Sequence, residues 1–205
     1  MKDSLLPEVV LIAAMDRHRV IGGPDGGIPW HLPDDVAHFR AAAQGRHLLL
    51  GRRTFEEMQG WFTHQIPLVL TRQEDYRVPG GGRVSDVAEA LACAAAAGQN
   101  LLLVAGGATV FAATIAMADR LLLTLVDTDV SEGLSSVQSD ALPRVPDPAA
   151  FGDWREMSRI ERPEDDRHVF ARTFLELKRS SISPAMLPSA GRGAGSLQPG
   201  SRRPE

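Results

Sequence analysis

The alternation of short apolar runs with helical stretches is the feature that most limits how this chain can fold. Residues 9–14 form an unbroken apolar run, which is typical of a strand that is buried on both faces. Similar runs follow at 47–50, 67–71, 101–105 and 121–127. Strands that alternate with helices predict an α/β fold with a mostly parallel central sheet and helices on both of its faces.

Four helices are predicted between these strands from proline, N-cap and glycine signals at their ends. The segments 154–160 and 168–177 are expected to pair as an antiparallel hairpin that closes the sheet. The only cysteine, Cys93, is expected to be a small buried thiol rather than a nucleophile. The helices run from Pro33 to about Ala43, from Arg53 to about Gln59, from the N-cap Ser85 to Ala97, and from Gly106-Gly107 to about Met117.

Composition limits the domain organisation and the class of protein. After Arg179 the sequence becomes rich in Ser, Gly and Pro and lacks aromatic residues, so we expect one domain over residues 1–179 and a disordered tail over 180–205. A net charge of −4 argues against a dedicated nucleic-acid binder. No stretch approaches 18 consecutive apolar residues, so we expect no membrane span and a soluble, cytoplasmic protein.

An aspartate within an apolar helical stripe is the first candidate for chemistry. Asp35 shares one helix face with Leu32, Val36 and Phe39. Burying an unpaired carboxylate is costly. Asp35 is therefore either a functional acid or an ordinary first-turn acid that complements the helix dipole, a role that suits Asp34 well. A functional carboxylate here would match a planar pair of donors, such as an amidine or a 2-aminopyrimidine ring.

Two turns that follow strands are candidates for binding phosphate. The segment Gly51-Arg52-Arg53-Thr54 places two arginines at a helix start, which is unfavourable unless an anion lies there. Arg72 follows the next strand and suggests a second phosphate group; the alternative is that these are solvated surface arginines. The Gly106-Gly107 turn either admits a pyrophosphate close to the backbone or is a simple tight turn. Together with Asp35, the turns suggest a dinucleotide-dependent enzyme that acts on a flat, donor-rich heterocycle.

These segments resemble the dihydrofolate reductase family in their order and spacing. The resemblance rests on Ile28-Pro29-Trp30-His31-Leu32-Pro33-Asp34-Asp35, Gly51-Arg52-Arg53-Thr54-Phe55-Glu56 and Gly106-Gly107, and it covers about residues 8–179. It implies the reduction of 7,8-dihydrofolate to tetrahydrofolate with NADPH as the cofactor. It also implies a monomer whose partner is a small-molecule substrate, with no metal.

The resemblance also implies roles for individual residues. Asp35 would hold the pterin 2-amino group and N3 and promote protonation at N5, while Trp30 and Thr124 complete the polar network through water. The segment Gly22–Pro29 would be a mobile lid, and the Gly106-Gly107 peptide would be cis. The apolar substrate slot would consist of Ile12, Val36, Phe39, Met58 and Phe62. The cofactor would contact Ala14 and Ile21 beside the nicotinamide, then Gly22, Arg52, Arg53, Thr54, Thr71, Arg72, Gly106, Gly107, Ala108, Thr109, Val110 and Phe111.

Three departures from the family pattern bear on the substrate and the cofactor. Gln65 stands where the family has an arginine that binds the α-carboxylate of the folate glutamate. Ala108 replaces the third glycine of the second turn, and Leu134 replaces the aspartate of a Glu-Gly-Asp segment. Two alternatives therefore stay open. One is a reductase of the same fold for a tail-less pterin or a riboflavin-pathway pyrimidine, and the other is a nucleotide-binding protein with little catalysis.

Overall fold

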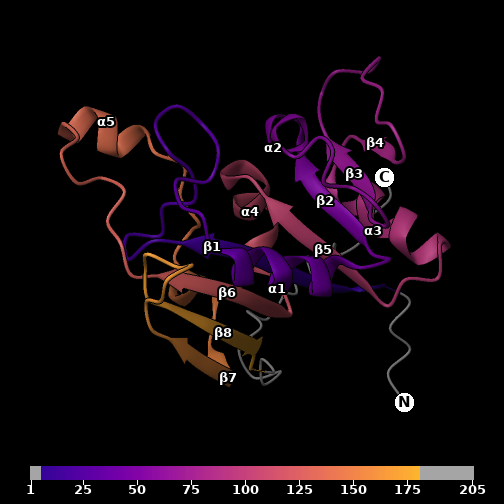
Figure 1. Ribbon diagram of the computed structural model, residues 1–205. Helices are drawn as coiled ribbons and strands as arrows, with labels where there is room; N and C mark the ends of the chain where they lie inside the picture. The colour runs from indigo at the N-terminus through magenta and orange to yellow at the C-terminus, as the bar shows by residue number, and fades with distance from the viewer. Residues whose placement is uncertain (1–5, 181–205) are drawn as a thin grey trace, which may run out of the picture.

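One eight-stranded sheet forms the centre of the computed structural model, which describes residues 6–180 (Figure 1). Its strands are β1 (Glu8–Met15), β2 (His47–Gly51), β3 (Ile66–Leu70), β4 (Gly82–Val84), β5 (Leu101–Gly106), β6 (Arg120–Val126), β7 (Trp154–Arg162) and β8 (Arg172–Arg179). They lie in the order β4-β3-β2-β5-β1-β6-β8-β7. All pairs from β4 to β6 are parallel, whereas β8 is antiparallel to both β6 and β7. The predicted mostly parallel sheet with a C-terminal antiparallel hairpin is confirmed.

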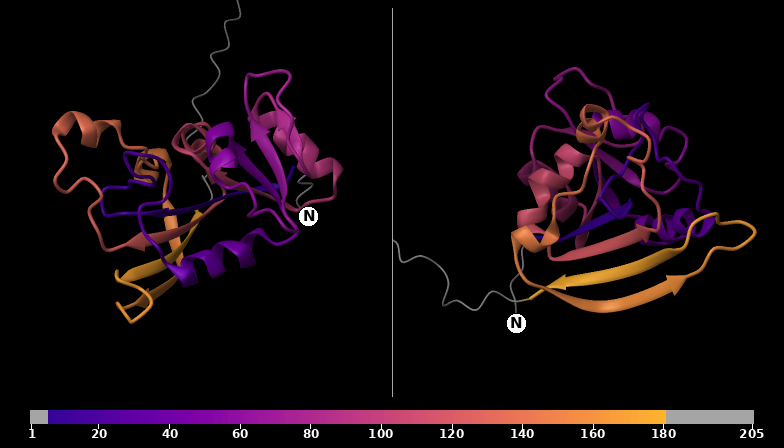
Figure 2. Two further views of the ribbon diagram at one scale, coloured as in Figure 1. Left: turned by 45° about the horizontal axis from the view of Figure 1, so that its top comes forward. Right: turned by 90° about the vertical axis from the view of Figure 1, so that its left-hand side faces the viewer.

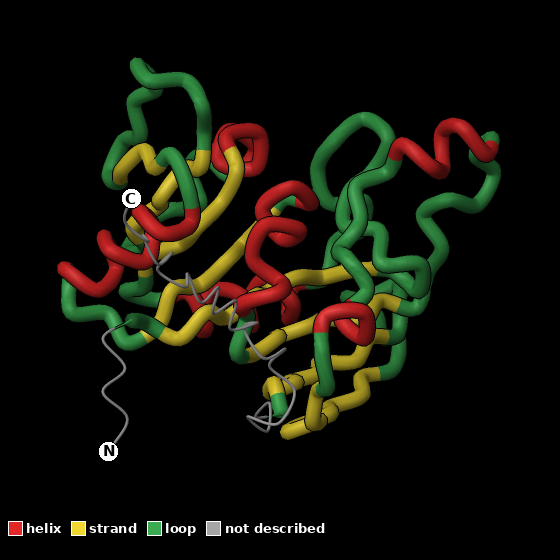
Figure 3. Tube along the Cα trace, turned by 180° about the vertical axis from the view of Figure 1, so that it is seen from behind, coloured by secondary structure: helices red, strands yellow, loops and turns green. Residues whose placement is uncertain are grey.

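Helices cover both faces of this sheet, as predicted. The main helices are α1 (Pro33–Ala43), α2 (Arg52–Glu57), α3 (Val87–Ala96) and α4 (Ala108–Thr114), followed by the 3₁₀ turn η1 (Ile115–Met117). Ala43 of α1 and Phe55 of α2 pack into one buried apolar cluster. Ala90 of α3 and Phe111 of α4 pack into a second cluster, on the face that Figure 3 shows from behind. The hydrophobic core is therefore divided by the sheet into two layers.

Several elements lie outside the predicted set. β4 has three residues, and α5 (Ser136–Ala141) buries none of its side chains, so neither has a strong apolar pattern. The 3₁₀ turn η2 (Pro148–Phe151) was also not predicted. The predicted strand over 168–177 begins only at Arg172, because residues 163–171 form a loop in which the His168 ring is buried.

Two details of α3 correct the prediction. The N-cap is Asp86, whose carboxylate accepts a hydrogen bond from the N–H of Glu89 at 2.8 Å, and not Ser85. The expectation that Cys93 is buried is wrong, because its side chain is exposed. The buried stripe of α3 consists instead of Ala90 and Ala94, which are one helical turn apart.

The loop between β1 and α1 is anchored to the segment that follows β6. The carboxylate of Asp16 is 2% exposed and accepts hydrogen bonds from the N–H groups of His18, Val20 and Val130 at 2.8, 2.8 and 3.0 Å. The N–H of Ile21 also donates to the Pro143 carbonyl at 2.9 Å. The base of the predicted lid is therefore fixed, and the loop lies beside the segment that carries α5 (Figure 1).

Some expectations concern what the chain lacks or what lies outside the described residues. No helix in the described part of the chain is long and apolar enough to cross a membrane. Within residues 6–180, no group of three or more His, Cys, Asp or Glu side chains could hold a metal ion. The predicted tail over 180–205 lies, apart from Ser180, outside the described residues, so the division into domain and tail stays a prediction.

Candidate active site

The Asp35 carboxylate lies in the first turn of α1 and is mostly buried against the sheet. The hydroxyl of Thr124, a buried residue of β6, hydrogen-bonds to this carboxylate. Burial raises the pKa of the Asp35 carboxyl above its ordinary value; the Thr124 hydrogen bond and the nearby His38 oppose the rise, and the charge of Asp34 adds to it. The structure thus places two of the predicted catalytic residues in contact.

An apolar cluster lies on the same face of the sheet as Asp35. Four of the five residues predicted for the substrate slot pack into this cluster: Ile12 of β1, Phe39 of α1, Met58 and Phe62. Val36, the fifth, is half-buried and follows Asp35 directly. The structure therefore brings a carboxylate and a set of apolar side chains together from α1, β1 and the segment after α2.

Trp30 supplies a polar group without a partner near the start of α1. Its side chain is 9% exposed and packs with Leu32, Val126 and Ala14. The indole N–H is buried and has no hydrogen-bond partner among the described residues. Because an unpaired buried donor is unfavourable, this position suits a bound ligand or an ordered water. Ile21, predicted to flank the nicotinamide together with Ala14, is half-buried and packs against the cluster on the opposite face, so its predicted role stays a prediction.

The two candidate phosphate turns adjoin one another at the C-terminal edge of the sheet. β2 and β5 are neighbours, and Leu50 lies opposite Gly106 in their register. A Cβ atom on Gly107 would lie 3.1 Å from the Thr54 hydroxyl, and one on Gly51 would lie 4.0 Å from the Gly106 carbonyl oxygen. The Gly106-Gly107 peptide is cis, which confirms the expectation from the resemblance. Sheet topology therefore joins turns that are more than 50 residues apart in the sequence.

Neither helix that begins at these turns has a side-chain cap, because the N-cap residues are Gly51 and Gly107. First-turn N–H groups have no acceptor within their own helix, so those of Ala108 and Thr109 remain available at the edge of the sheet. Val110 and Phe111 differ, since their side chains are buried and their N–H groups bind the Gly107 carbonyl at 2.9 and 3.0 Å. Of the predicted cofactor residues in α4, only the first two offer free groups.

The arginines predicted to bind phosphate are not equivalent. Arg52 is held by Glu56, whose two carboxylate oxygens accept from one guanidinium nitrogen at 2.9 Å each. Arg53 and Arg72 are exposed, and neither forms a hydrogen bond or ion pair with another described residue. The Thr71 hydroxyl accepts from the N–H of Gln73 at 3.2 Å. Arg53 and Arg72 therefore have guanidinium groups that are free to meet an anion.

Gln65 is half-buried, and its carboxamide oxygen forms hydrogen bonds with the backbone of its own loop. The oxygen accepts hydrogen bonds from the N–H groups of Thr63 at 2.9 Å and His64 at 3.2 Å. Nearby in the chain, Trp61 is covered by the Arg40 guanidinium of α1, which lies 5.4 Å from the centroid of the ring. Gln65 thus stabilises the loop conformation and supplies no positive charge.

Asp34 was expected to be an ordinary first-turn acid that complements the helix dipole, but the structure shows it in an ion pair with a distant residue. Its two carboxylate oxygens accept from Nε of Arg172 at 3.0 and 2.9 Å, and Nε2 of His168 lies 2.6 Å from one of them. Burial opposes ionisation, but the hydrogen bonds and charge of Arg172 and the charge of His168 hold the pKa of Asp34 below its ordinary value. These contacts join residues more than 130 positions apart, so no local pattern could have predicted them.

The fold and the site together define an α/β protein with a buried carboxylate beside an apolar cluster and with two glycine turns at the C-terminal edge of its sheet. The family model for dihydrofolate reductase matches residues 8–179. The chain therefore belongs to the dihydrofolate reductase family, which confirms the resemblance seen in the sequence.

Individual relatives agree with this placement. Dihydrofolate reductase type 3 of Salmonella typhimurium is 32% identical over 171 residues, which cover 83% of this chain and 98% of the relative. Dihydrofolate reductase HdrB of Haloferax volcanii is 33% identical over 182 residues, or 85% and 86% of the two chains. A solved structure of dihydrofolate reductase from Enterococcus faecalis, complexed with NADP(H) and RAB-propyl, aligns with a TM-score of 0.70 at 28% identity and covers 84% of this chain and 96% of that one.

Asp35→Asn is expected to raise the free energy of unfolding at neutral pH. Burial raises the pKa of the carboxyl in the folded protein, so the folded state holds this proton more tightly than the unfolded chain does. The ionised carboxylate therefore lowers stability above the folded-state pKa, and this loss disappears below the unfolded-state value of about 3.9.

Urea unfolding of wild type and variant from about pH 3.5 to pH 8 measures the effect. The two stabilities should converge at acid pH and separate at neutral pH. The matched control is Asp25→Asn, which changes an exposed aspartate of the lid and should leave stability unchanged. A variant that is no more stable than wild type at pH 7 would contradict the burial of an ionisable Asp35.

Proposed function

We propose that this protein reduces 7,8-dihydrofolate to 5,6,7,8-tetrahydrofolate with NADPH. The observation that carries the proposal is the mostly buried Asp35 carboxylate, which is hydrogen-bonded to Thr124 on the same face of the sheet as the apolar cluster. A carboxylate in this setting matches the two parallel donors of a pterin ring, the 2-amino group and N3–H. Membership in the dihydrofolate reductase family supports the same activity.

The protein's part of the reaction is to bind, orient and protonate the substrate. When bound, NADPH supplies the hydride. Asp35 would anchor the pterin through its 2-amino group and N3 and favour protonation at N5, so that the ring accepts a hydride. The indole N–H of Trp30 and the hydroxyl of Thr124 would extend this polar network through water. The lid over Gly22–Pro29 would keep bulk water away from the two rings.

The residues at the adjoining glycine turns suit NADPH. A Cβ atom on Gly107 would approach the Thr54 hydroxyl to 3.1 Å, which is a tight contact, so glycine at this position leaves the backbone more open to a pyrophosphate. The free guanidinium groups of Arg53 and Arg72 match phosphate oxygens through paired N–H donors. The solved relative from Enterococcus faecalis was complexed with NADP(H), which supports the same cofactor here.

Loss of NADPH absorbance in the presence of dihydrofolate tests the proposed activity directly. Asp35→Asn should keep the fold and NADPH binding but lose most hydride transfer at neutral pH. Removing one charge-assisted anchor costs about 1.5–3 kcal/mol, or roughly a ten- to hundredfold loss of rate. Near-normal turnover of dihydrofolate by Asp35→Asn would refute the role given to this carboxylate.

A same-fold reductase for a pterin without a glutamate tail is the second candidate, and Gln65 is the observation that favours it. A neutral carboxamide whose oxygen is already engaged by Thr63 and His64 offers little to the tail carboxylate. Activity with a tail-less dihydropterin but not with dihydrofolate would favour this reading. NADPH binding without oxidation of NADPH by either substrate would instead favour a nucleotide-binding protein with little catalysis.

Gln65→Arg should lower the KM for dihydrofolate while leaving kcat nearly unchanged. A guanidinium would add a charge-assisted contact to the tail, about 1–3 kcal/mol or roughly one to two decades in affinity. The tail is remote from the reacting ring and binds ground and transition states alike. Kinetics with dihydrofolate and a tail-less pterin measure this effect in both proteins.

Two outcomes of this comparison would contradict the reasoning about Gln65. If wild type already binds folate far better than the tail-less compound, another group binds the carboxylate. Arg40 is the cation to test next, because its guanidinium lies over Trp61 in the same part of the chain. If neither wild type nor Gln65→Arg distinguishes the two compounds, the tail is not part of the substrate.

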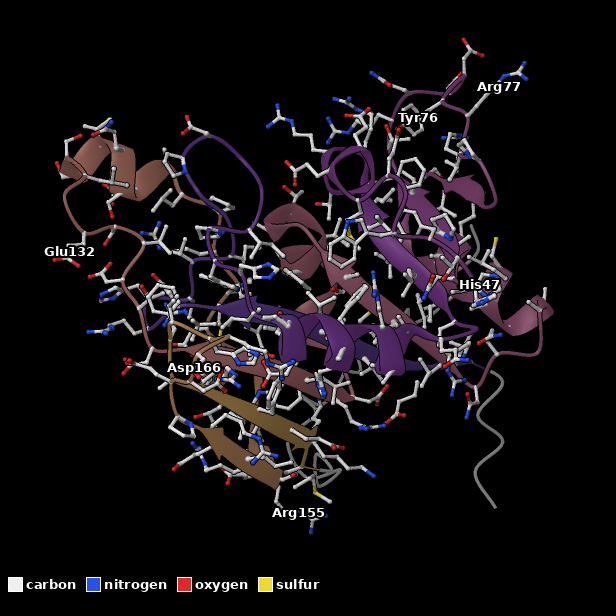
Figure 4. All side chains as sticks on the ribbon, viewed as in Figure 1. His47, Tyr76, Arg77, Glu132, Arg155 and Asp166 are labelled. Atoms are coloured by element: carbon white, nitrogen blue, oxygen red, sulfur yellow. The ribbon has the colours of Figure 1, made fainter. Side chains whose placement is uncertain are left out.

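Arg72→Ala should weaken the binding of NADPH more than that of NADH, because only NADPH carries the 2′-phosphate that pairs with a guanidinium. Arg52→Ala, predicted from the sequence to act in the same way, should have a smaller effect because Glu56 already holds Arg52. The matched control is Arg77→Ala, which removes the outward-pointing arginine of the loop between β3 and β4 (Figure 4). Fluorescence titration measures the binding, and equal losses for both cofactors with Arg72→Ala would remove this residue from the 2′-phosphate site.

The remaining expectations stay predictions. We propose a monomer whose partner is the small-molecule substrate, without nucleic acid or membrane, and a cytoplasmic location. Sedimentation of the purified full chain would test the oligomeric state.

A further inference from the structure

A cluster of four ionisable side chains beside Asp35 takes no part in the proposed chemistry. It consists of Asp34 in α1, Arg172 at the start of β8, and His168 and Asp165 in the loop over 163–171. Arg172 binds both carboxylate oxygens of Asp34 through Nε at 3.0 and 2.9 Å, and its NH2 group also contacts this carboxylate. His168 lies between the two acids, with one ring nitrogen 2.6 Å from Asp34 and the other 2.6 Å from Asp165.

The burial of Arg172 and His168 distinguishes this cluster from an ordinary solvent-exposed ion pair. The side chains of Arg172 and His168 are 2% and 1% exposed, whereas those of Asp34 and Asp165 are 29% and 49% exposed. A buried guanidinium is costly unless it is paired and hydrogen-bonded, so Arg172 depends on Asp34 and on the Pro163 carbonyl, which it binds at 2.8 Å. The hydrogen bond from His168 contributes most to lowering the pKa of Asp165 to about 2.

The cluster holds the turn of α1 that carries Asp35. The N-cap residue of α1, Leu32, provides no side-chain hydrogen bond, so the first turn lacks the usual local anchor. Figure 2 shows the loop that joins β7 to β8 lying beside this end of α1. Two open cavities of about 600 and 400 Å³ are lined by Arg172 and by Asp34 respectively. The ion pair therefore bridges α1 and β8 beside these openings.

The cluster also sets the charge next to Asp35. The negative charge of Asp34 disfavours ionisation of Asp35, whereas His38 on the same helix and the Thr124 hydroxyl of β6 favour it. Arg172 pairs with Asp34 and so offsets the neighbouring negative charge. Glu161 and Arg162 of β7 line the larger cavity together with Arg172, but neither is paired with Asp34.

We propose that Arg172 is a positioning residue for Asp35, which fixes the first turn of α1 through Asp34 and reduces the effect of the negative charge beside the Asp35 carboxylate. The proposal rests on the proposed function of Asp35, but it concerns a property of the free protein. It predicts that charge changes at Arg172 and at Asp34 act on Asp35 in opposite directions.

The test is a ¹³C NMR titration of the Asp35 carboxyl in the ligand-free full chain. Arg172→Met should raise the pKa of Asp35 by about 0.5–1, Asp34→Asn should lower it by a similar amount, and the double variant should return close to wild type. The matched control is Arg162→Met, which removes an exposed arginine from the same cavity and should move the pKa much less. A general loss of packing would not give shifts of opposite sign that cancel.

Enzyme kinetics test the positioning role of Arg172. Arg172→Lys keeps the charge but loses the planar contact with Asp34, so kcat should fall several-fold while the pKa of Asp35 stays near its wild-type value. Equal pKa values in wild type, Arg172→Met and Asp34→Asn would overturn the proposal. If Arg172→Met does not fold, Asp34→Asn alone decides, since an unchanged pKa in that variant contradicts the charge role. If the protein does not reduce dihydrofolate, the titration of Asp35 in the ligand-free chain still tests the role of Arg172. A failure of this proposal can therefore be told apart from a failure of the proposed function.

Discussion

Placing a carboxylate among apolar side chains is the costly feature around which the rest of the site is arranged. Asp35 loses most of its hydration, and burial raises its pKa. The hydrogen bond from Thr124 and the nearby His38 favour the ionised carboxylate, whereas the charge of Asp34 opposes it. A ligand with two parallel donors would add hydrogen bonds to this carboxylate, so the raised pKa of the free site and the proposed binding of a flat heterocycle have the same origin.

Sheet topology brings the other half of the site to Asp35. β5 lies between β2 and β1, although it follows both in the sequence, so the turns after β2 and β5 meet at one edge. Helices that begin at glycine N-caps leave their first N–H groups free there. This is the edge at which open parallel sheets bind their ligands. The same arrangement explains why residues of the site come from every part of the described chain.

The departures from the family pattern differ in how much they change the structure of the candidate site. Ala108 is the first residue of α4 and has no need of a positive φ, which in this turn is found at Gly106 (φ 109°). Replacing the third glycine therefore leaves the backbone of the turn intact. Gln65 matters more, because a neutral group bound to its own loop stands where the family places a cation. For the proposed function, the departures thus bear on binding of the substrate tail more than on the turn proposed to bind the cofactor.

The amino-acid pattern predicted the architecture and the family and singled out Asp35 as a candidate, because each left a local signal. Apolar runs marked the strands, glycine and proline marked the helix ends, and a carboxylate stood out within the apolar stripe of α1. The tertiary structure was needed to show that Arg52 is held by Glu56 while Arg72 is free, and that Asp34 binds Arg172. Such pairings depend on which side chains the crossovers of the sheet bring together, and side chains more than 100 residues apart leave no periodic pattern that would record their contact.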